Sequence, residues 1–312
     1  MDIIYLLLGF IIIIKGSDML VDGSVNLAKF LKIATLVIGL TIVAIATGVP
    51  EIAISISSSL KGSNGLLLGN LLGSNIFNIL FILGLIAIIK PLYIKKEIIL
   101  KNYAFALLSC LVLFIISYDI YFGDSLVNLI TRTEGILLLC FAGIFLYSTV
   151  LGATLDKNIK AEKGKFSFKD ILYIVVGIAL IGLSAEVIVN SAVNISKWLG
   201  IGEDLIGLTI IAVGTNLPEL VTSIVAVRKG EVDIAIGNLV GTNIYNIFLI
   251  LGLAATINPI TISSNAFIDI IVLAITSFIV YIFIQHKKDI NRKEGIIMIL
   301  LYIIYIVYVV IR

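Results

Sequence analysis

The stretch GLTIVAIATGVPEIAISISSSLKG at 39–62 returns as GLTIIAVGTNLPELVTSIVAVRKG at 207–230. The likeness continues without a gap to residues 91 and 259 at a constant offset of 168, and 27 of the 53 paired positions are identical. Each copy places a proline and a glutamate side by side inside an otherwise apolar segment. Internal similarity of this kind predicts two structural repeats, with a functional site where the copies meet.

The composition indicates a polytopic membrane protein. Of the 312 residues, 60% are hydrophobic and 13% are charged, and the mean hydropathy is +1.17. A helix needs about 20 apolar residues to cross the hydrocarbon core of a bilayer. Ten segments qualify, at 3–28, 34–60, 65–90, 99–118, 133–153, 171–198, 203–228, 232–257, 264–285 and 294–311. We therefore predict an all-α membrane protein with ten transmembrane helices joined by short loops.

Lysine and arginine are distributed unevenly over the predicted loops. Seventeen lie at the odd-numbered loops, whereas four lie at the even-numbered loops or the C-terminus. Because positive charge favours the cytoplasmic side, we expect both termini outside the cell and the protein in the cell membrane. Five helices per repeat is an odd number, so the repeats must be inverted. The predicted division is a first repeat at 1–155, a cytoplasmic linker at 156–170 and a second repeat at 171–312.

The sequence lacks the motifs of common membrane enzymes and pumps. A single histidine excludes a His-rich zinc site, and HExxH, GxSxG, GxGxxG and the P-loop are absent. We therefore expect no enzyme activity and no cofactor. The net charge of +2 gives no reason to expect a nucleic-acid partner.

Proline interrupts the second and seventh predicted helices. Pro50 has no N–H and its ring crowds the carbonyl four residues back, so the helix should break near 46–49. The same reasoning places a second break near Gly214, and Glu51 and Glu219 follow the two breaks. Carbonyls freed at membrane depth must be satisfied by protein or by a water-filled site. Hard cations take such carbonyl, hydroxyl and carboxylate oxygens, so we predict a cation site at the two glutamates.

Two carboxylates in the membrane also need a balancing charge. One charged residue at a helix centre costs about 3 kcal/mol, and repulsion between two of them favours proton uptake or cation binding. One divalent ion would neutralise the pair, and monovalent ions or protons could replace it in turn. Lys15 is the only basic residue in the core segments that could pair with a glutamate. It also lies three residues from Asp18, close enough to pair with it on one helix face. Asp18 and its counterpart Glu186 are interpreted as structural acids.

Polar residues recur every four positions in the third and eighth predicted helices, along one helical stripe. Those interpreted as ion ligands are Ser74, Asn78, Thr242 and Asn246. The amides interpreted as hydrogen bonds between helices are Asn70, Asn75, Asn238 and Asn243. The similarity between the copies fades in the fourth, fifth, ninth and tenth helices, which we interpret as scaffold.

These motifs carry a family resemblance. TGVPE at 47–51 is followed by GNLLGSNIFNILFILG at 69–84, and GTNLPE at 214–219 by GNLVGTNIYNIFLILG at 237–252. They resemble the α-repeats of the calcium/cation antiporter superfamily, and most closely those of prokaryotic sodium/calcium exchangers. The resemblance covers essentially the whole chain. It implies an antiporter with four cation sites between helices two, three, seven and eight, in which helices one and six slide to alternate access.

The same resemblance implies roles for individual residues. Glu51 and Glu219 would be the ligands shared by Ca²⁺ and Na⁺. The other implied ligands are Thr47 and Thr215 for calcium, Ala44, Ala212, Ser74 and Thr242 for sodium, and Asn78 and Asn246 along the middle.

Three positions bear on the coupling ion. The family commonly has serine after the motif threonine, where this chain has Gly48 and Asn216. Gly48 brings no side-chain oxygen, so a sodium site there would be weaker, absent, or rebuilt from water and backbone. Asn246 is an amide where potassium-dependent relatives carry an acid, which argues against potassium coupling.

We therefore predict a secondary antiporter that exchanges Ca²⁺ for Na⁺ across the cell membrane, acting as a monomer in the lipid bilayer without ATP. H⁺/Ca²⁺ exchange is the alternative within transport, because a proton needs no oxygen cage at Gly48. A passive cation channel is the third possibility. It is less favoured, because close-packing glycines and buried carboxylates are typical of a closed site that must rearrange.

Overall fold

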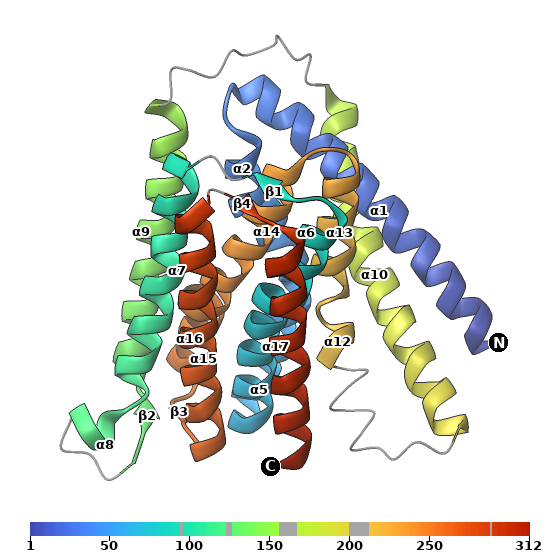
Figure 1. The fold of residues 1–312 in the computed structure, drawn as a ribbon. Coiled ribbons are helices and arrows are strands. Elements are labelled where there is room, and N and C mark those ends of the chain that lie inside the picture. Colours follow the sequence, from blue (N-terminus) through green and yellow to red (C-terminus); the bar gives the residue numbers. More distant parts are fainter. Residues whose placement is uncertain (94–95, 123–126, 156–166, 200–211, 288) are drawn as a thin grey trace. The chain divides into compact units, whose positions relative to one another are not determined.

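The computed structural model describes residues 1–93, 96–122, 127–155, 167–199, 212–287 and 289–312, which Figure 1 traces from blue to red. The first part contains α1 (Asp2–Leu31), α2 (Thr35–Ile38), the π-helical η1 (Gly39–Val43), α3 (Ala44–Thr47), α4 (Val49–Leu60), α5 (Asn64–Ile76), the π-helical η2 (Phe77–Ile82), α6 (Leu83–Ile89), β1 (Leu92–Tyr93), α7 (Lys96–Ile116), α8 (Asp119–Phe122), β2 (Leu129–Ile130) and α9 (Arg132–Leu155). The second part contains α10 (Phe168–Trp198), α12 (Ala212–Gly214), α13 (Leu217–Arg228), α14 (Val232–Tyr245), the π-helical η4 (Asn246–Leu251), α15 (Gly252–Ile257), β3 (Ile260–Thr261), α16 (Ser264–Lys287), β4 (Asp289–Ile290) and α17 (Arg292–Ile311). Helices dominate, and the all-α prediction is confirmed.

Most of the predicted membrane spans are present as long apolar helices. Among the described residues seven are found, at Asp2–Leu31, Asn64–Ile89, Arg132–Ala153, Phe168–Trp198, Val232–Ile257, Ser264–Gln285 and Arg292–Ile311. The bent pair Thr35–Thr47 and Val49–Leu60 makes up to eight. The predicted segment 99–118 corresponds to α7, of which Asn102–Ile116 is a shorter apolar helix. The segment 203–228 lies partly outside the described residues, as does most of the predicted linker.

Both predicted helix breaks are present. α3 ends at Thr47 and α4 begins at Val49, with a bend of 49° between the two halves of this span. In the second copy α12 ends at Gly214, and α13 begins at Leu217 with a proline in its first turn. Because proline cannot donate to the preceding turn but fits the start of a helix, the chain restarts a helix at each position. Glu51 and Glu219 stand in the first turns of the restarted helices.

The described chain forms two compact units, and each takes segments from both sequence copies. The first, here called the α1 unit, contains Met1–Val49, Gly152–Leu239 and Ile303–Arg312. The second, the α5 unit, contains Pro50–Leu151 and Val240–Tyr302. The candidate site residues are described below within each unit.

In the α1 unit, α1 and α10 lie side by side along their length (Figure 1). Their backbones approach closely where Gly16 meets Gly177, because a Cβ on Gly16 would lie 3.0 Å from the Gly177 carbonyl oxygen. Asn26 Nδ2 donates to Asp170 Oδ1 over 2.7 Å, which adds a polar contact to this apolar pair. Small residues at such a contact allow close packing of helices in a membrane.

Asp18 pairs with Lys229 and not with its sequence neighbour Lys15. The ammonium group of Lys229, which follows α13, lies 3.2 Å from Asp18 Oδ1 and 2.7 Å from Asp22 Oδ1. It also donates to the backbone carbonyl of Asp18 over 3.1 Å. A partner 211 positions away in sequence therefore binds this acid, and the structural role expected for Asp18 is a contact between α1 and the end of α13.

In the α5 unit, two short antiparallel ladders connect the segments that flank the helices. β1 pairs with β4, with Leu92 opposite Ile290, and β2 pairs with β3, with Ile130 opposite Ile260. Each ladder has two residue pairs, so the strands join loops and form no sheet layer. Ser59 Oγ donates to the Ala254 carbonyl over 2.7 Å and joins α4 to α15 in the buried interior.

Candidate cation-binding site

The site residues of the α1 unit begin with Thr47, the last residue of α3. Its hydroxyl is fully buried and donates to Asn238 Oδ1 of α14 over 2.9 Å. Asn238 in turn donates through Nδ2 to Ser223 Oγ of α13 over 3.3 Å. Since a hydroxyl has one hydrogen and two lone pairs, this bond turns the hydrogen of Thr47 toward Asn238 and leaves its oxygen able to bind a cation. Asn238 therefore joins helices, as interpreted from the sequence, and also orients a candidate ligand.

Gly48 follows Thr47 and ends the helical turn of α3. Its N–H donates to the Ala44 carbonyl over 3.2 Å, and its backbone has φ −77° and ψ 4°. This conformation is open to residues with a side chain, so the backbone does not require glycine here. The missing hydroxyl at this position is consequently a difference in chemistry and not a consequence of the fold.

Thr215, Asn216 and Glu219 lie at the second break, also in the α1 unit. Asn216 caps α13, since its carbonyl accepts from the Leu220 N–H over 3.0 Å. Its Nδ2 donates to Thr215 Oγ1 over 3.3 Å. Glu219 is fully buried one turn further on. Ala212, the remaining predicted ligand of this copy, begins α12.

Glu51 belongs to the α5 unit and is fully buried in the first turn of α4. Neither carboxylate oxygen has a hydrogen-bond partner among the described residues, and the same holds for the buried hydroxyl of Ser55. An acid without donors in a buried place is costly. Because a carboxylate can only accept hydrogen bonds, the missing partner must be a donor or a cation.

The polar stripe along α5–η2 and α14–η4 supplies the other candidate ligands of the α5 unit. Ser74, Asn78, Thr242 and Asn246 are all between 0% and 2% exposed. The Oγ of Ser74 and the Oδ1 atoms of Asn78 and Asn246 have no hydrogen-bond partner in the described part of the chain. Buried polar atoms nearly always have partners. A group of oxygens that lacks them is therefore suited to a cation. Both amides lie in π-helical segments, which often mark functional positions.

The residue types limit what these oxygens can bind. Within the described ranges, no three His, Cys, Asp or Glu side chains gather in a way that could hold a metal ion. A transition-metal centre built from imidazole or thiolate ligands is therefore not indicated here. The available set of carboxylate, amide, hydroxyl and carbonyl oxygens is the set preferred by hard cations such as Ca²⁺ and Na⁺.

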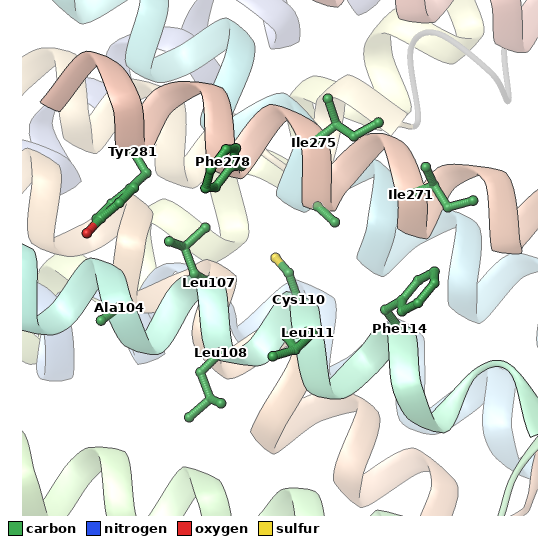
Figure 2. A pocket seen from close by; sticks show the side chains of 11 residues that line it. Ala104, Leu107, Leu108, Cys110, Leu111, Phe114, Ile271, Ile275, Phe278 and Tyr281 are labelled. Carbon is green, nitrogen blue, oxygen red and sulfur yellow. The ribbon is translucent and has the colours of Figure 1, made fainter. Parts of the chain in front are cut away.

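A separate groove in the α5 unit does not contribute to this site. It has a volume of about 600 Å³ and lies along α7 and α16, where Figure 2 shows side chains from both helices lining it. Only Cys110 and Tyr281 bring polar side-chain atoms to an otherwise apolar lining. None of the predicted ligands lines this groove, and its lining is unsuited to a cation.

Ser223 is a member of the polar network that the sequence interpretation missed. Its counterpart at the offset of 168 is Ser55, and both serines are fully buried four residues after the motif glutamate. The signal was present, because the two hydroxyls recur at matched positions. They lie one helical turn beyond the glutamates, on the same helix face.

Comparisons with known proteins give the family. The sodium/calcium exchanger protein family matches residues 1–151 and 169–311. The putative antiporter CaxA of Alkalimonas amylolytica is 33% identical over 315 residues, which cover 96% of this chain and 95% of that protein. The sodium/calcium exchanger MaX1 of Methanosarcina acetivorans is 31% identical over 338 residues, covering 96% of each.

A solved structure agrees with the sequence relatives. The sodium-calcium exchanger NCX_Mj, soaked with zero Na⁺ and Ca²⁺, matches with a TM-score of 0.87 at 31% identity, over 98% of each chain. With its apolar helices, this chain is a multi-pass membrane protein. The motifs, the broken helices and these similarities together place it by descent: the chain belongs to the sodium/calcium exchanger family.

Proposed function

We propose that this chain is a secondary antiporter that exchanges Ca²⁺ for Na⁺ across the cell membrane by alternating access. The observation that carries the proposal is Glu51, a buried acid at a helix break whose oxygens have no donor among the described residues. The uncharged amide oxygens of Asn78 in η2 and Asn246 in η4 likewise have no donor among the described residues. Membership of the sodium/calcium exchanger family indicates that the cations bound by such oxygens are Ca²⁺ and Na⁺.

The proposed ligands comprise two charged and several neutral groups. Glu51 and Glu219 provide the negative charge, and Ca²⁺ or Na⁺ is the transported cargo, with no resident cofactor and no covalent chemistry. The neutral ligands are proposed to be Thr47, Thr215, Ser74, Thr242, Asn78 and Asn246, with carbonyls at Ala44 and Ala212 and neighbouring contributions from Asn216 and the backbone of Gly48. Burial of the described acceptors and the bond from Thr47 to Asn238 support this assignment.

The proposed architecture is two inverted repeats of five helices, at 1–155 and 171–312, with both termini outside the cell and the monomer as the working unit. The long apolar helices and the two matched breaks support it. So does the excess of lysine and arginine at the odd-numbered loops.

Uptake of radioactive calcium into proteoliposomes tests the function. The vesicles would be loaded with Na⁺, K⁺ or an acidic choline buffer, and external sodium would be absent. We expect uptake only from sodium-loaded vesicles, abolished by Glu51→Gln or Glu219→Gln. Uptake driven by the proton gradient alone would show that protons, and not sodium ions, are the coupling ion. Calcium flux that needs no counter-cation would refute exchange and indicate a channel.

A further inference from the structure

Four asparagines meet in the interior of the α5 unit. Asn75 and Asn78 come from the α5–η2 helix, and Asn243 and Asn246 hold the same positions in α14–η4. All four are between 0% and 4% exposed. The sequence interpretation gave them two different roles, with Asn75 and Asn243 as contacts between helices and the other two as ligands.

Asn75 and Asn243 exchange hydrogen bonds with each other's backbone. Asn75 Nδ2 donates to the Asn243 carbonyl oxygen over 3.2 Å, and Asn243 Nδ2 donates to the Asn75 carbonyl oxygen over 3.1 Å. A backbone carbonyl can only accept. Each amide must therefore present its nitrogen to the facing backbone, and this requirement fixes which end of the side chain is Nδ2 and which is Oδ1.

The fixed amides in turn orient the next pair. Asn78 Nδ2 donates to Asn243 Oδ1 over 3.0 Å, and Asn246 Nδ2 donates to Asn75 Oδ1 over 2.8 Å. Because an amide oxygen offers no hydrogen, only the nitrogen ends of Asn78 and Asn246 can make these bonds. Their Oδ1 atoms must point away, and these are the oxygens without a hydrogen-bond partner among the described residues.

We propose that Asn75 and Asn243 are positioning residues that hold the Asn246 and Asn78 amides with oxygen, and not nitrogen, toward the transported cation. The proposal rests on the proposed function, since it concerns how two of its ligands are presented. An amide that is free to rotate can present N–H groups, which repel a cation, whereas a fixed one presents an oxygen ligand at all times. Partners of metal ligands typically change metal affinity by about 10–100-fold when they are removed.

The pairing makes a crossed prediction. Asn243→Ala releases Asn78, and Asn75→Ala releases Asn246, so each should weaken Ca²⁺ binding by about 10–100-fold in calorimetric titration of the purified protein. Asparagine replaced by aspartate has oxygen at both ends, so its rotation no longer matters. In the Asn78→Asp background, Asn243→Ala should therefore cost less than about 3-fold, whereas Asn75→Ala should keep its full effect. In the Asn246→Asp background, Asn75→Ala should cost less than about 3-fold in Ca²⁺ affinity, whereas Asn243→Ala should keep its full effect.

Rescue separates positioning from general stability. If Asn75 and Asn243 only stabilised the fold, their alanine variants would lose Ca²⁺ affinity regardless of which ligand carries the second substitution. The proposal would be overturned if one aspartate substitution restored Ca²⁺ affinity in both alanine variants, or if neither aspartate substitution restored it in either. Unchanged Ca²⁺ affinity in Asn243→Ala and Asn75→Ala would also overturn it. If Asn243→Ala does not fold, Asn243→Ser replaces it, because serine keeps a polar group but is too short to reach Asn78.

Two controls distinguish the ways in which the experiment can fail. Ser59→Ala removes a buried hydrogen bond between α4 and α15 in the same unit, and it should leave Ca²⁺ affinity unchanged. Glu51→Gln should abolish binding. If Glu51→Gln still binds Ca²⁺ like the unaltered protein, the proposed function fails. If it does not bind while the asparagine variants bind normally, the function stands and only the positioning role is refuted.

Discussion

Substitution of Glu51 by glutamine should stabilise the protein without cations and abolish its response to calcium. The change keeps the side-chain volume and removes the charge from a fully buried carboxylate with no described hydrogen-bond partner. A charged acid at a helix centre costs about 3 kcal/mol. A buried amide with unmet hydrogen bonds costs about 1–3 kcal/mol, so the net gain should lie between about 0 and 2 kcal/mol. We therefore expect the variant without ions to be at least as stable as the unaltered protein without ions.

Calcium should reverse this order. With free Ca²⁺ at 100 times the dissociation constant, binding stabilises the folded state by about 2.7 kcal/mol. In a chain of this size about 1 kcal/mol shifts the melting temperature by roughly 2 °C. The variant should thus melt up to about 4 °C above the unaltered protein in a chelator. In calcium the unaltered protein should gain about 5 °C and the variant nothing.

The assay is thermal unfolding in detergent, monitored by intrinsic fluorescence, in chelator and in a calcium series. Glu186→Gln is the matched control, because it makes the same chemical change at an exposed position of α10, and it should keep the full calcium shift. A calcium shift of normal size in Glu51→Gln would refute the assignment of this carboxylate as a ligand. A lower melting temperature of the variant in chelator would show that Glu51 has a stabilising partner, which contradicts the energetic reasoning.

Three further outcomes are expected. Gly48→Ser should lower the sodium concentration that half-saturates calcium uptake, because the backbone at φ −77° accepts a side chain and the hydroxyl adds a ligand; unchanged sodium dependence would place the oxygen elsewhere. Gly39→Ala should destabilise the protein by about 1–3 kcal/mol in thermal unfolding, since a Cβ there would lie 2.7 Å from the Ile234 carbonyl oxygen; an unchanged melting temperature would contradict this close packing. Burial raises the pKa of Glu231 above its ordinary value. The positive charge of Lys29 lowers this pKa, whereas the negative charges of Asp233 and Asp22 raise it further. The folded protein therefore binds this proton more tightly than the unfolded chain, and stability falls as pH rises through the raised pKa. Glu231→Gln should raise the melting temperature at pH 7, and this increase should disappear below about pH 4.5. An equal increase in melting temperature at the two pH values would rule out titration of Glu231 as its cause.

The membrane spans and helix breaks could be predicted because their causes are local. About 20 apolar residues suffice to identify a span, and Pro50 interrupts a helix wherever the helix lies. The partner of Asp18 could not be predicted in the same way. Lys15 is near in sequence, but Lys229 binds Asp18 across the contact between α1 and the end of α13. Such a choice depends on which helices pack together, and hydropathy carries no information about that.

The sequence suggests the residue types of the candidate site but not the hydrogen bonds that connect them. The sequence assigned Asn75 to helix contacts and Asn78 to ion ligation, and their spacing could not show that both donate to Asn243. Their different roles depend on the backbone of Asn243, whose carbonyl accepts from Asn75. The π-helical turns at η2 and η4 also escaped prediction, because π-helices are rare and have no simple sequence pattern.

The apparent loss of similarity in the later helices has a local explanation. TRTEG at 131–135 and NRKEG at 291–295 begin α9 and α17 at an offset of 160, so a comparison at 168 misses them. Their geometry is also alike. The Thr131 N–H donates to Glu134 Oε2 over 2.7 Å, and the Asn291 N–H donates to Glu294 Oε2 over 2.9 Å. These are equivalent helix starts, so the duplication extends into the helices interpreted as scaffold, and the loops before them differ in length.

The glycines that follow these helix starts connect the copies reciprocally. A Cβ on Gly84 would lie 2.8 Å from the Gly295 carbonyl oxygen, and one on Gly252 would lie 3.0 Å from the Gly135 carbonyl oxygen. Gly84 and Gly252 are equivalent at the offset of 168, and Gly135 and Gly295 at the offset of 160. Each contact therefore joins one copy to the other, as do the paired amides of Asn75 and Asn243. Contacts that come in such reciprocal pairs are what a two-fold relation between copies produces. The α5 unit thus supports the proposed inverted repeat independently of the charge distribution from which it was first inferred.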